Sequence, residues 1–362
     1  MRQVVVLLGS EEGAVASKYR RPRALTPGDT VAVLSPSWGG PHSFPHIFDR
    51  GIATLRGWGL QIKEYPSTRM DANALRSNTA QRVADIHDAF ADPQIAAIIA
   101  SIGGDDSMLL LPHLDGALIG RHPKILLGYS DTTTLLTFAH LQGMVTFHGP
   151  SVMSGLAQLA SHPTAHRTHL HTMLFSTQAT LNYTAARHYS DGYIDWADPQ
   201  QRVELLPTQF SRGWQFLQGK GVHRGQLFGG NIEVLEFIKG TRYWPEPDFW
   251  YDKLFFLETS EEKPSITAVT RWLRNYGIQG IFHKIAGLLF GRAKDYSLRE
   301  QIALDAAILQ VVRDEFGARE LPIVTHVDIG HTEPQWIMPL GVMAHVDCRE
   351  QHISLVEPWL RG

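Results

Sequence analysis

Ser130 lies where an apolar run, LLG, meets the polar run YSDTTT and the chain then turns apolar again. This pattern predicts a strand that turns sharply into a helix at the serine. Such a turn exposes the Oγ as a nucleophile, and free backbone N–H groups at the start of the helix can stabilise an oxyanion. Gly128 fits the hydrolase pattern G-x-S-x-G, but Thr132 replaces its second glycine. The alternative is that Ser130 or Asp131 simply caps the helix.

A nucleophilic serine needs a base, and the base needs an acceptor that orients it. His331 is the best placed base, because it follows a glycine in a loop that leaves the strand-like run PIVTHVD. The histidines at 148, 326 and 345 lie inside apolar strand-like runs, which is typical of structural histidines. Glu258 ends the apolar run KLFFLE, where a carboxylate is poorly solvated unless it is paired. The order Ser130, Glu258, His331 is allowed, since triads are defined by geometry.

Other chemistry remains open at this point. The segment GGDDS after a buried strand could cradle a phosphate and a metal ion, which predicts an ATP-dependent kinase. Two lobes around a cleft would also suit a binding module without catalysis. A hydrolase differs from a kinase in working in excess EDTA, and from a binding module in reacting with a serine probe.

Two groups of histidines could be read as metal sites. In a strand His326 and Asp328 share a face, but His331 lies beyond it in the loop. The second group has helical spacing without a carboxylate, and we interpret it as one side of an exposed polar helix. It consists of His162, His166, His169 and His171. We therefore expect no metal site.

The elements that position these residues alternate between strand and helix in the first half of the chain. Strand-like segments occur at 30–37, 60–66, 95–107, 124–131 and 145–152, with helical segments at 44–59, 79–93 and 132–143. This alternation predicts a parallel sheet covered on both faces. Ligands bind beyond the carboxyl ends of such strands, so we expect the segments SPS, SIGGDDS and GYSD to converge at one edge.

The remaining residues predict a different organisation. Residues 1–18 read as an N-terminal extension, and 19–160 as the domain with the parallel sheet. Residues 161–220 are polar, aromatic and poorly periodic, which indicates a connecting region, and we expect it to carry the specificity loop. Short strands and two helices return in 221–362 and predict a smaller mixed α/β domain.

Composition limits the partners. The 362 residues are 43% hydrophobic with a net charge of -3, so we expect two folded domains and no nucleic-acid partner. No apolar stretch is long enough to cross a membrane. The single cysteine, Cys348, excludes an internal disulfide and fits the cytoplasm.

Several motifs together resemble the LD-carboxypeptidase family of serine peptidases. They are GYSDTT, SIGGDDS, GQLFGGN, FFLETSEEKPS, FGR and DIGHTEPQWIMPLG, in this order, and the resemblance covers about residues 20 to 355. It implies a Rossmann-like N-terminal domain with a parallel sheet, a smaller mixed α/β C-terminal domain, and an active site in the cleft between them. It also implies a homodimer with neither metal nor cofactor.

By the same resemblance, the catalytic triad falls on Ser130, Glu258 and His331. The backbone N–H groups of Gly104 and Asp131 look like the oxyanion hole, in agreement with their place at the ligand edge of the sheet. His331 would take the proton of Ser130 as the serine attacks an amide carbonyl, and Glu258 would hold the imidazole.

Two branches of the family fit. One removes the terminal D-alanine from murein tetrapeptides, and the other, the microcin C immunity branch, hydrolyses an aminoacyl-nucleotide. The loop SIGGDDS with Gly103, the tryptophan Trp196 and the lysine Lys263 look like the immunity branch. Asn231 in the FGGN turn is a further candidate for the polar end of the substrate. We therefore expect a small aminoacyl-nucleotide or peptide substrate, with murein peptides as the alternative.

Overall fold

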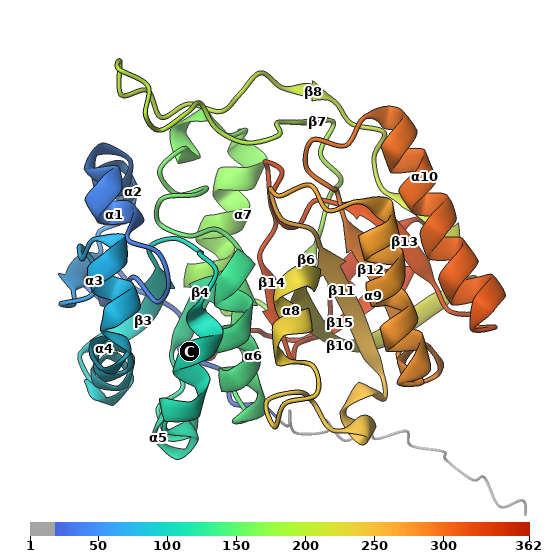
Figure 1. Cartoon of the computed structure of the whole chain (residues 1–362), viewed down its shortest axis with the longest axis horizontal. Coiled ribbons are helices and arrows are strands. Elements are labelled where there is room, and N and C mark those ends of the chain that lie inside the picture. The colour runs from blue at the N-terminus through green and yellow to red at the C-terminus, as the bar shows by residue number, and fades with distance from the viewer. Residues whose placement is uncertain (1–18) are drawn as a thin grey trace, which may run out of the picture.

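The computed structural model describes residues 19–362, which form two β-sheets that lie side by side and a β-ribbon that runs across both lobes (Figure 1). The N-terminal extension expected at 1–18 lies outside the described residues. The first sheet has the order β14-β5-β4-β3-β1-β2. Its strands are β1 (Thr30–Leu34), β2 (Gln61–Glu64), β3 (Ile95–Ala100), β4 (Ile125–Gly128), β5 (Thr146–His148) and β14 (Met338–Leu340).

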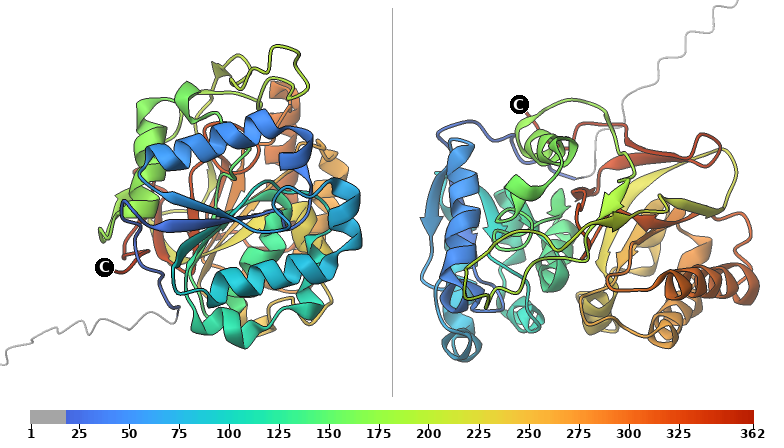
Figure 2. Two further views of the ribbon diagram at one scale, coloured as in Figure 1. Left: turned by 90° about the vertical axis from the view of Figure 1, so that its left-hand side faces the viewer. Right: turned by 90° about the horizontal axis from the view of Figure 1, so that it is seen from above.

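Strands β1 to β5 are parallel, as the alternating pattern predicts. Helices cover the sheet on both faces, with α2 on one face and α4 on the other (Figure 2, left). All six residues of β3, IAAIIA, are buried, as expected for a strand inside a covered sheet. The helices of this lobe are α1 (Gly40–Ser43), α2 (Pro45–Gly57), α3 (Ala72–Ser77), α4 (Thr79–Ala91), α5 (Gly116–Arg121) and α6 (Thr133–Leu141).

Helix α4 illustrates how local sequence sets these elements. The side chain of Asn78 caps its N-terminus by accepting a hydrogen bond from Gln81 N. Val83, Ile86 and Phe90 recur at helical spacing and are buried against the sheet. The helix ends at Ala91, two residues before Pro93. Its bounds agree with the segment expected at 79–93.

The second sheet has eight strands in the order β6-β16-β15-β10-β11-β12-β13-β9. Strands β10 to β13 are parallel, and antiparallel strands extend the sheet on both sides. The strands are β6 (Leu181–Asn182), β9 (Gln215–Gln218), β10 (Val222–Asn231), β11 (Lys253–Glu258), β12 (Gly287–Gly291), β13 (Ile323–Val327), β15 (Met343–Asp347) and β16 (His352–Leu355). The sheet of the second lobe is thus the larger one, since it has eight strands and the first sheet has six.

The helices of the second lobe are α8 (Ile232–Ile238), α9 (Ile266–Ile278) and α10 (Leu298–Leu309). Helix α10 continues as a π-helical turn over Gln310–Glu315. A capping box at Ser297 and Glu300 begins α10. The side chain of each residue accepts a hydrogen bond from the backbone N–H of the other. Short 3-10 turns occupy Ser107–His113, Ser130–Thr132, Leu159–Ser161, Pro247–Trp250 and Ile281–His283.

The region 161–220 contains more than the loops expected from its composition. It forms helix α7 (Thr164–Phe175) and a two-stranded ribbon of β7 (His188–Tyr189) and β8 (Gln209–Phe210). Figure 2 (right) shows the chain around this ribbon passing over both lobes. The same region supplies β6 and β9, which form the two edges of the second sheet. Residues on both sides of the expected boundary at 221 therefore contribute strands to the second sheet.

The C-terminal part of the chain also returns to the first lobe. Strand β14 adds to β5 in antiparallel orientation, and Arg361 N donates to Pro22 O at 2.9 Å. The C-terminal part of the chain thus supplies one strand to the first sheet, and its last residues pair with residues near the start of the described chain. None of the helices in residues 19–362 is long and apolar enough to span a membrane.

Candidate active site

Ser130 occupies the turn between β4 and α6, as the sequence predicts. Its φ is +56°, a left-handed conformation that non-glycine residues rarely adopt, and the 3-10 turn Ser130–Thr132 leads directly into α6. A Cβ on Gly128 would lie 2.8 Å from Thr132 Cγ2 and 3.1 Å from Ala100 Cβ. The glycine therefore lets the turn fold back tightly on β4. Strain held at such a turn is common at functional sites.

A pocket of about 520 Å³ opens above the carboxyl ends of the first sheet. Trp38 follows β1, Gly103 and Gly104 follow β3, and Ser130 follows β4, so the three strand ends converge as expected. The second lobe and the connecting region close the other side. They contribute Tyr193, Trp196, Glu261, Lys294 and His331.

Glu258 and His331 form a buried pair in the second lobe. Glu258 ends β11 with its side chain fully buried, and His331 Nδ1 donates to its Oε2 at 2.7 Å. A Cβ on Gly330, whose φ is +90°, would lie 2.4 Å from the same oxygen. Glycine is thus required beside the carboxylate. His148 Nε2 lies 3.7 Å from the other oxygen, Oε1, so Glu258 sits between two imidazoles.

The charges around His331 shift the pKa values of both His331 and Glu258. Burial opposes ionisation of Glu258, but the neighbouring His331 and His148 outweigh it and lower the pKa of the carboxyl. Burial lowers the pKa of His331, but Glu258 and then Glu261 outweigh it and raise that pKa to about 10. The hydrogen bond to His331 lowers the pKa of Glu261 to about 2. The imidazole is therefore stabilised as a cation in this state.

Glu261 is one of the pocket residues that the sequence analysis missed. His331 Nε2 lies 3.0 Å from Glu261 Oε2, and in the described chain no hydrogen bond joins His331 to Ser130. Both side chains nevertheless line the same pocket. Glu261 follows β11 by three residues in the polar loop TSEEKPS, where the sequence analysis considered only Lys263. The sequence signal that could have identified Glu261 was an acidic side chain close to the end of a buried strand.

The loop SIGGDDS is held against the serine turn. A Cβ on Gly103 would lie 3.1 Å from Ser130 Oγ and 3.5 Å from Asp131 N. Ser37 Oγ accepts from Asp105 N at 3.0 Å and from Asp106 N at 3.1 Å. The backbone of the proposed oxyanion residue Gly104 lies beside this cluster, in the same pocket as Ser130.

Asp131 and Asp106 hold the loop SIGGDDS in place through hydrogen bonds. Asp131 is buried and accepts from Ser107 N at 2.9 Å through Oδ2, and burial raises the pKa of its carboxyl. Asp106 accepts from the buried Arg82 at 2.7 Å. The second aspartate of GGDDS is therefore engaged with an arginine of α4. This leaves only Asp105 of the pair lining the pocket, which removes the basis for reading the motif as a metal-holding kinase loop.

The four substrate-binding expectations fall in different places. Gly103 and Trp196 line the pocket. Asn231 is buried at the N-terminus of α8, where its side chain accepts from Val234 N at 3.0 Å and its backbone N donates to Thr133 Oγ1. Its Nδ2 is buried without a hydrogen-bond partner among the described residues. Lys263 does not line the pocket, because its Nζ pairs with Glu300 at 3.1 Å.

Aromatic rings form one wall of the pocket. Trp196 stacks on Trp38 with ring centroids 6.4 Å apart and an interplanar angle of 15°. It also stacks on Tyr193 at 6.2 Å and 26°. Lys294 also lines this pocket, and the sequence analysis missed it. The wall offers flat apolar surface beside the serine turn.

The first histidine group does not form a metal site. Asp328 pairs with Arg292 at 2.6 Å and accepts from Trp214 Nε1 at 2.8 Å. His326 Nε2 donates to Asp305 at 3.1 Å, away from His331. Each of these groups has its own partners. This agrees with the interpretation of His326 as a structural histidine.

The second histidine group contradicts the interpretation as an exposed polar helix. His162, His166 and His169 are buried, and His171 alone is exposed. His169 Nε2 accepts from Ile337 N at 2.9 Å, which gives it a structural role. Helix α7 packs its histidine side against the loop after β13, and that packing brings Glu333 to His162 and His166. The carboxylate that the sequence group lacked therefore comes from a residue 171 positions after His162 and 167 after His166 along the chain.

Two family models match this chain. The LD-carboxypeptidase N-terminal domain matches residues 31–149, and the LD-carboxypeptidase C-terminal domain matches residues 224–346. Together they cover the serine turn and the Glu258–His331 pair.

The chain is also similar to curated relatives over almost its whole length. It is 27% identical to the microcin C7 self-immunity protein MccF of Escherichia coli, covering 93% of this chain and 95% of the relative. It is 28% identical to the "Probable murein peptide carboxypeptidase" of Bacillus subtilis, covering 94% and 95%.

Solved structures of MccF have the same fold. The complex with glutamyl sulfamoyl guanosine matches with a TM-score of 0.82 at 25% identity, covering 94% of this chain and 99% of that chain. The complex with aspartyl sulfamoyl adenosine also matches with a TM-score of 0.82, at 26% identity, covering 94% and 100%. The two-domain α/β architecture is thereby confirmed.

Proposed function

The chain belongs to the LD-carboxypeptidase family and is a hydrolase of the serine peptidase type, and we propose that it uses Ser130, Glu258 and His331 to cleave the aminoacyl amide-type bond of an aminoacyl-nucleotide. The observation that carries this proposal is the aromatic wall of Trp196, Trp38 and Tyr193 in the pocket of Ser130. A nucleobase stacked there would place the attached aminoacyl group beside the serine turn.

The geometry supports a division of roles between the lobes. Ser130 Oγ attacks the carbonyl carbon while His331 Nε2 accepts its proton. Glu258 accepts from Nδ1 at 2.7 Å, which leaves Nε2 as the nitrogen that faces the pocket. The buried carboxylate then stabilises the imidazolium that forms. His331 gives this proton to the leaving nitrogen as the C–N bond breaks and the acyl-enzyme forms. The neutral imidazole then acts as the base for the water that hydrolyses the acyl-enzyme.

Glu261 must turn away from His331 before Ser130 attacks, and the imidazolium must lose its Nε2 proton to solvent so that this nitrogen can accept the proton of Ser130. Its Oε2 lies 3.0 Å from His331 Nε2, the atom that has to accept the proton of Ser130. The Glu261 side chain is 58% exposed, so it can turn toward solvent at small cost when substrate enters. The contact between Glu261 and His331 therefore belongs to the site before substrate enters.

The oxyanion of the tetrahedral intermediate would be held by the backbone. The N–H groups of Gly104 and Asp131 belong to the two strand ends that meet at the serine, and such pre-positioned donors stabilise charge as it develops. Gly103 packs against Ser130 Oγ, and a larger residue there would close the space for the carbonyl.

The substrate class rests on the pocket wall and on the relatives. Stacking of one base on an aromatic side chain is worth roughly 1–3 kcal/mol. The matched MccF structures hold glutamyl sulfamoyl guanosine and aspartyl sulfamoyl adenosine. Lys294 supplies a cation in the same pocket for the anionic part of such a substrate. The expected homodimer and the cytoplasmic location are also part of the proposal, and sedimentation of the purified chain tests the first.

A side-by-side hydrolysis assay tests the proposal. Purified chain is given an aminoacyl-sulfamoyl adenosine in one reaction and a murein tetrapeptide in the other, each in excess EDTA. We expect release of the free amino acid from the first and little release of D-alanine from the second. Cleavage of the murein peptide alone would instead assign the alternative activity.

Two variants sharpen this assay. Ser130→Ala should abolish turnover and leave the fold intact, with exposed Ser43→Ala as the control, and full activity of Ser130→Ala would overturn the mechanism. Trp196→Ala should raise KM for the nucleotide substrate by about 5- to 150-fold and change kcat little, which is the range that a lost base stack implies. Trp272→Ala, on helix α9 of the second lobe, controls for loss of a tryptophan elsewhere.

A further inference from the structure

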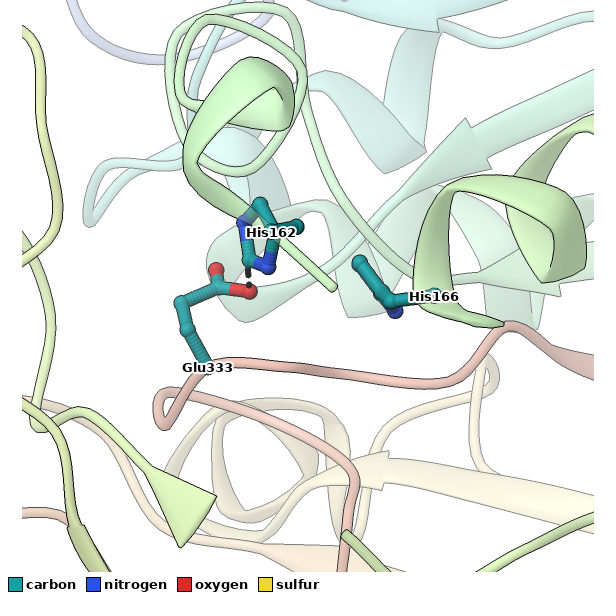
Figure 3. A group of neighbouring side chains, drawn as sticks. All are labelled: His162, His166 and Glu333. Atoms are coloured by element: carbon teal, nitrogen blue, oxygen red, sulfur yellow. Dashed lines mark ion pairs between the residues drawn. The ribbon is translucent and has the colours of Figure 1, made fainter. Parts of the chain in front are cut away.

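His162, His166 and Glu333 meet in the interior at the junction of three segments (Figure 3). His162 follows the 3-10 turn Leu159–Ser161, and His166 lies in the first turn of α7. Glu333 comes from the loop after β13, two residues beyond His331. In Figure 3 the carboxylate points toward the ring of His162, and His166 lies on the adjoining helix.

These three side chains are buried and largely without hydrogen bonds. Their exposed fractions are 2% for His162, 1% for His166 and 1% for Glu333. Both ring nitrogens of each histidine, and Glu333 Oε2, lack a hydrogen-bond partner among the described residues. Buried polar atoms are rarely left in this state, so five in one place point to a bound group.

The distances suit a small cation. One ligand atom from each residue can be chosen so that all lie within 4.8 Å of one another, and His162 Nε2 lies 3.5 Å from Glu333 Oε2. Ligands of a tetrahedral Zn²⁺ stand about 3.4 Å apart, given bonds of about 2.0 to 2.1 Å. The His162–Glu333 pair already has this spacing, and His166 offers a third ligand atom within 4.8 Å of both.

The surroundings also suit a metal ligand set. Glu333 Oε1 accepts from the hydroxyl of Tyr193 and from Gln335 Nε2 at 3.1 Å, which orients the carboxylate and leaves Oε2 free.

We propose that His162, His166 and Glu333 bind a divalent transition-metal ion, with Zn²⁺ as the best fit to two imidazoles and one carboxylate. A water completes the coordination. The site is separate from the serine pocket and acts as a structural clamp. It ties α7 to the loop that carries His331 and, through the paired backbones of Ser190 and Glu333, to the segment beside β7.

Zinc binding by the full chain tests this proposal directly. Protein stripped of metal with a chelator and dialysed is titrated with Zn²⁺ in a calorimeter. We expect one equivalent to bind with a dissociation constant below about 1 µM and thermal unfolding to shift upward in its presence. His166→Ala and Glu333→Gln should each weaken binding by about 100-fold or more. His171→Ala, on the exposed side of the same helix, should bind as the parent does.

A spectroscopic measurement on the unaltered chain protects the test against variants that fail to fold. Co²⁺ in place of Zn²⁺ should give the visible absorption of a four-coordinate site, and added Zn²⁺ should remove it. Absence of this absorption together with less than one equivalent of zinc taken up at about 100 µM would overturn the proposal. Equal zinc affinity in the parent and His166→Ala would overturn it as well. Neither readout depends on hydrolysis, so failure of the proposed function leaves this result unaffected.

Discussion

Gly330→Ala should damage the active site with a loss that can be worked from the structure. The added Cβ would lie 2.4 Å from Glu258 Oε2, whereas ordinary contacts begin near 3.4 Å, so the carboxylate must move by about 1 Å. A misplacement of this size at a catalytic group can lower kcat by about 10²-fold, and complete loss of the orienting carboxylate by about 10⁴-fold. We therefore expect kcat to fall by about 10² to 10⁴.

The same change should lower the stability of the fold. A φ of +90° costs an alanine about 1–2 kcal/mol, and disturbing the buried Glu258–His331 hydrogen bond adds about 1–3 kcal/mol. A loss of about 2–5 kcal/mol corresponds to a fall in Tm of several degrees in a chain of this size. Differential scanning calorimetry measures this fall, and steady-state kinetics on the aminoacyl-sulfamoyl adenosine measures kcat.

Gly28→Ala is the matched control. Its φ of +97° is close to that of Gly330, but a Cβ there meets nothing within 4 Å. It should lose about 1–2 kcal/mol of stability and keep its kcat. A folded Gly330→Ala protein whose kcat stays within about threefold of the parent would refute the role assigned to Glu258, since a 1 Å displacement would then have no effect. An equal loss of kcat in both variants would assign the loss to backbone strain instead.

Two further predictions concern charges. Glu261→Gln should raise kcat/KM by about two- to fivefold, because it weakens the contact that occupies His331 Nε2. The neighbouring change Glu262→Gln should leave kcat/KM unchanged. A fall in kcat/KM for Glu261→Gln would instead make Glu261 a substrate ligand. Burial lowers the pKa of Lys124 to about 8 from 10.5, so the unfolded state binds more protons between these values and stability should rise with pH across that window. Chemical unfolding at pH 8 and pH 10 measures this rise in the free energy of unfolding, which is at most about 3 kcal/mol. An equal rise in a Lys124→Met protein would contradict the assignment to Lys124.

The sequence was sufficient for features that depend on local pattern. Alternating strands and helices predicted the parallel sheet, because hydrophobic period and flanking turn residues act over a few positions. The convergence of the segments SPS, SIGGDDS and GYSD followed, since all parallel strands of a sheet end at the same edge. Glu258 was also identifiable, because it ends a buried strand where a carboxylate needs a partner. His331 was identifiable because it follows a glycine in the loop that leaves the next buried strand but one.

Other features were decided by tertiary packing. Lys263 was expected in the pocket but pairs with Glu300, and Glu261 reaches His331 in its place, because the turn after β11 determines which of three adjacent charged residues faces the serine. Strand β14 joins the first sheet although its neighbours along the chain build the second. Neither outcome has a local signature, since each depends on how the lobes meet.

The histidines of α7 show this division most clearly. Their helical spacing is visible in the sequence and predicts one face of a helix, but the same spacing suits a solvated face and a buried one. Only the packing of α7 on the loop after β13 buries His162 and His166 and places Glu333 beside them. A carboxylate that lies 171 positions after His162 along the chain leaves no mark on the local pattern. Sequence therefore determined which residues can do chemistry, and long-range packing decided which of them meet.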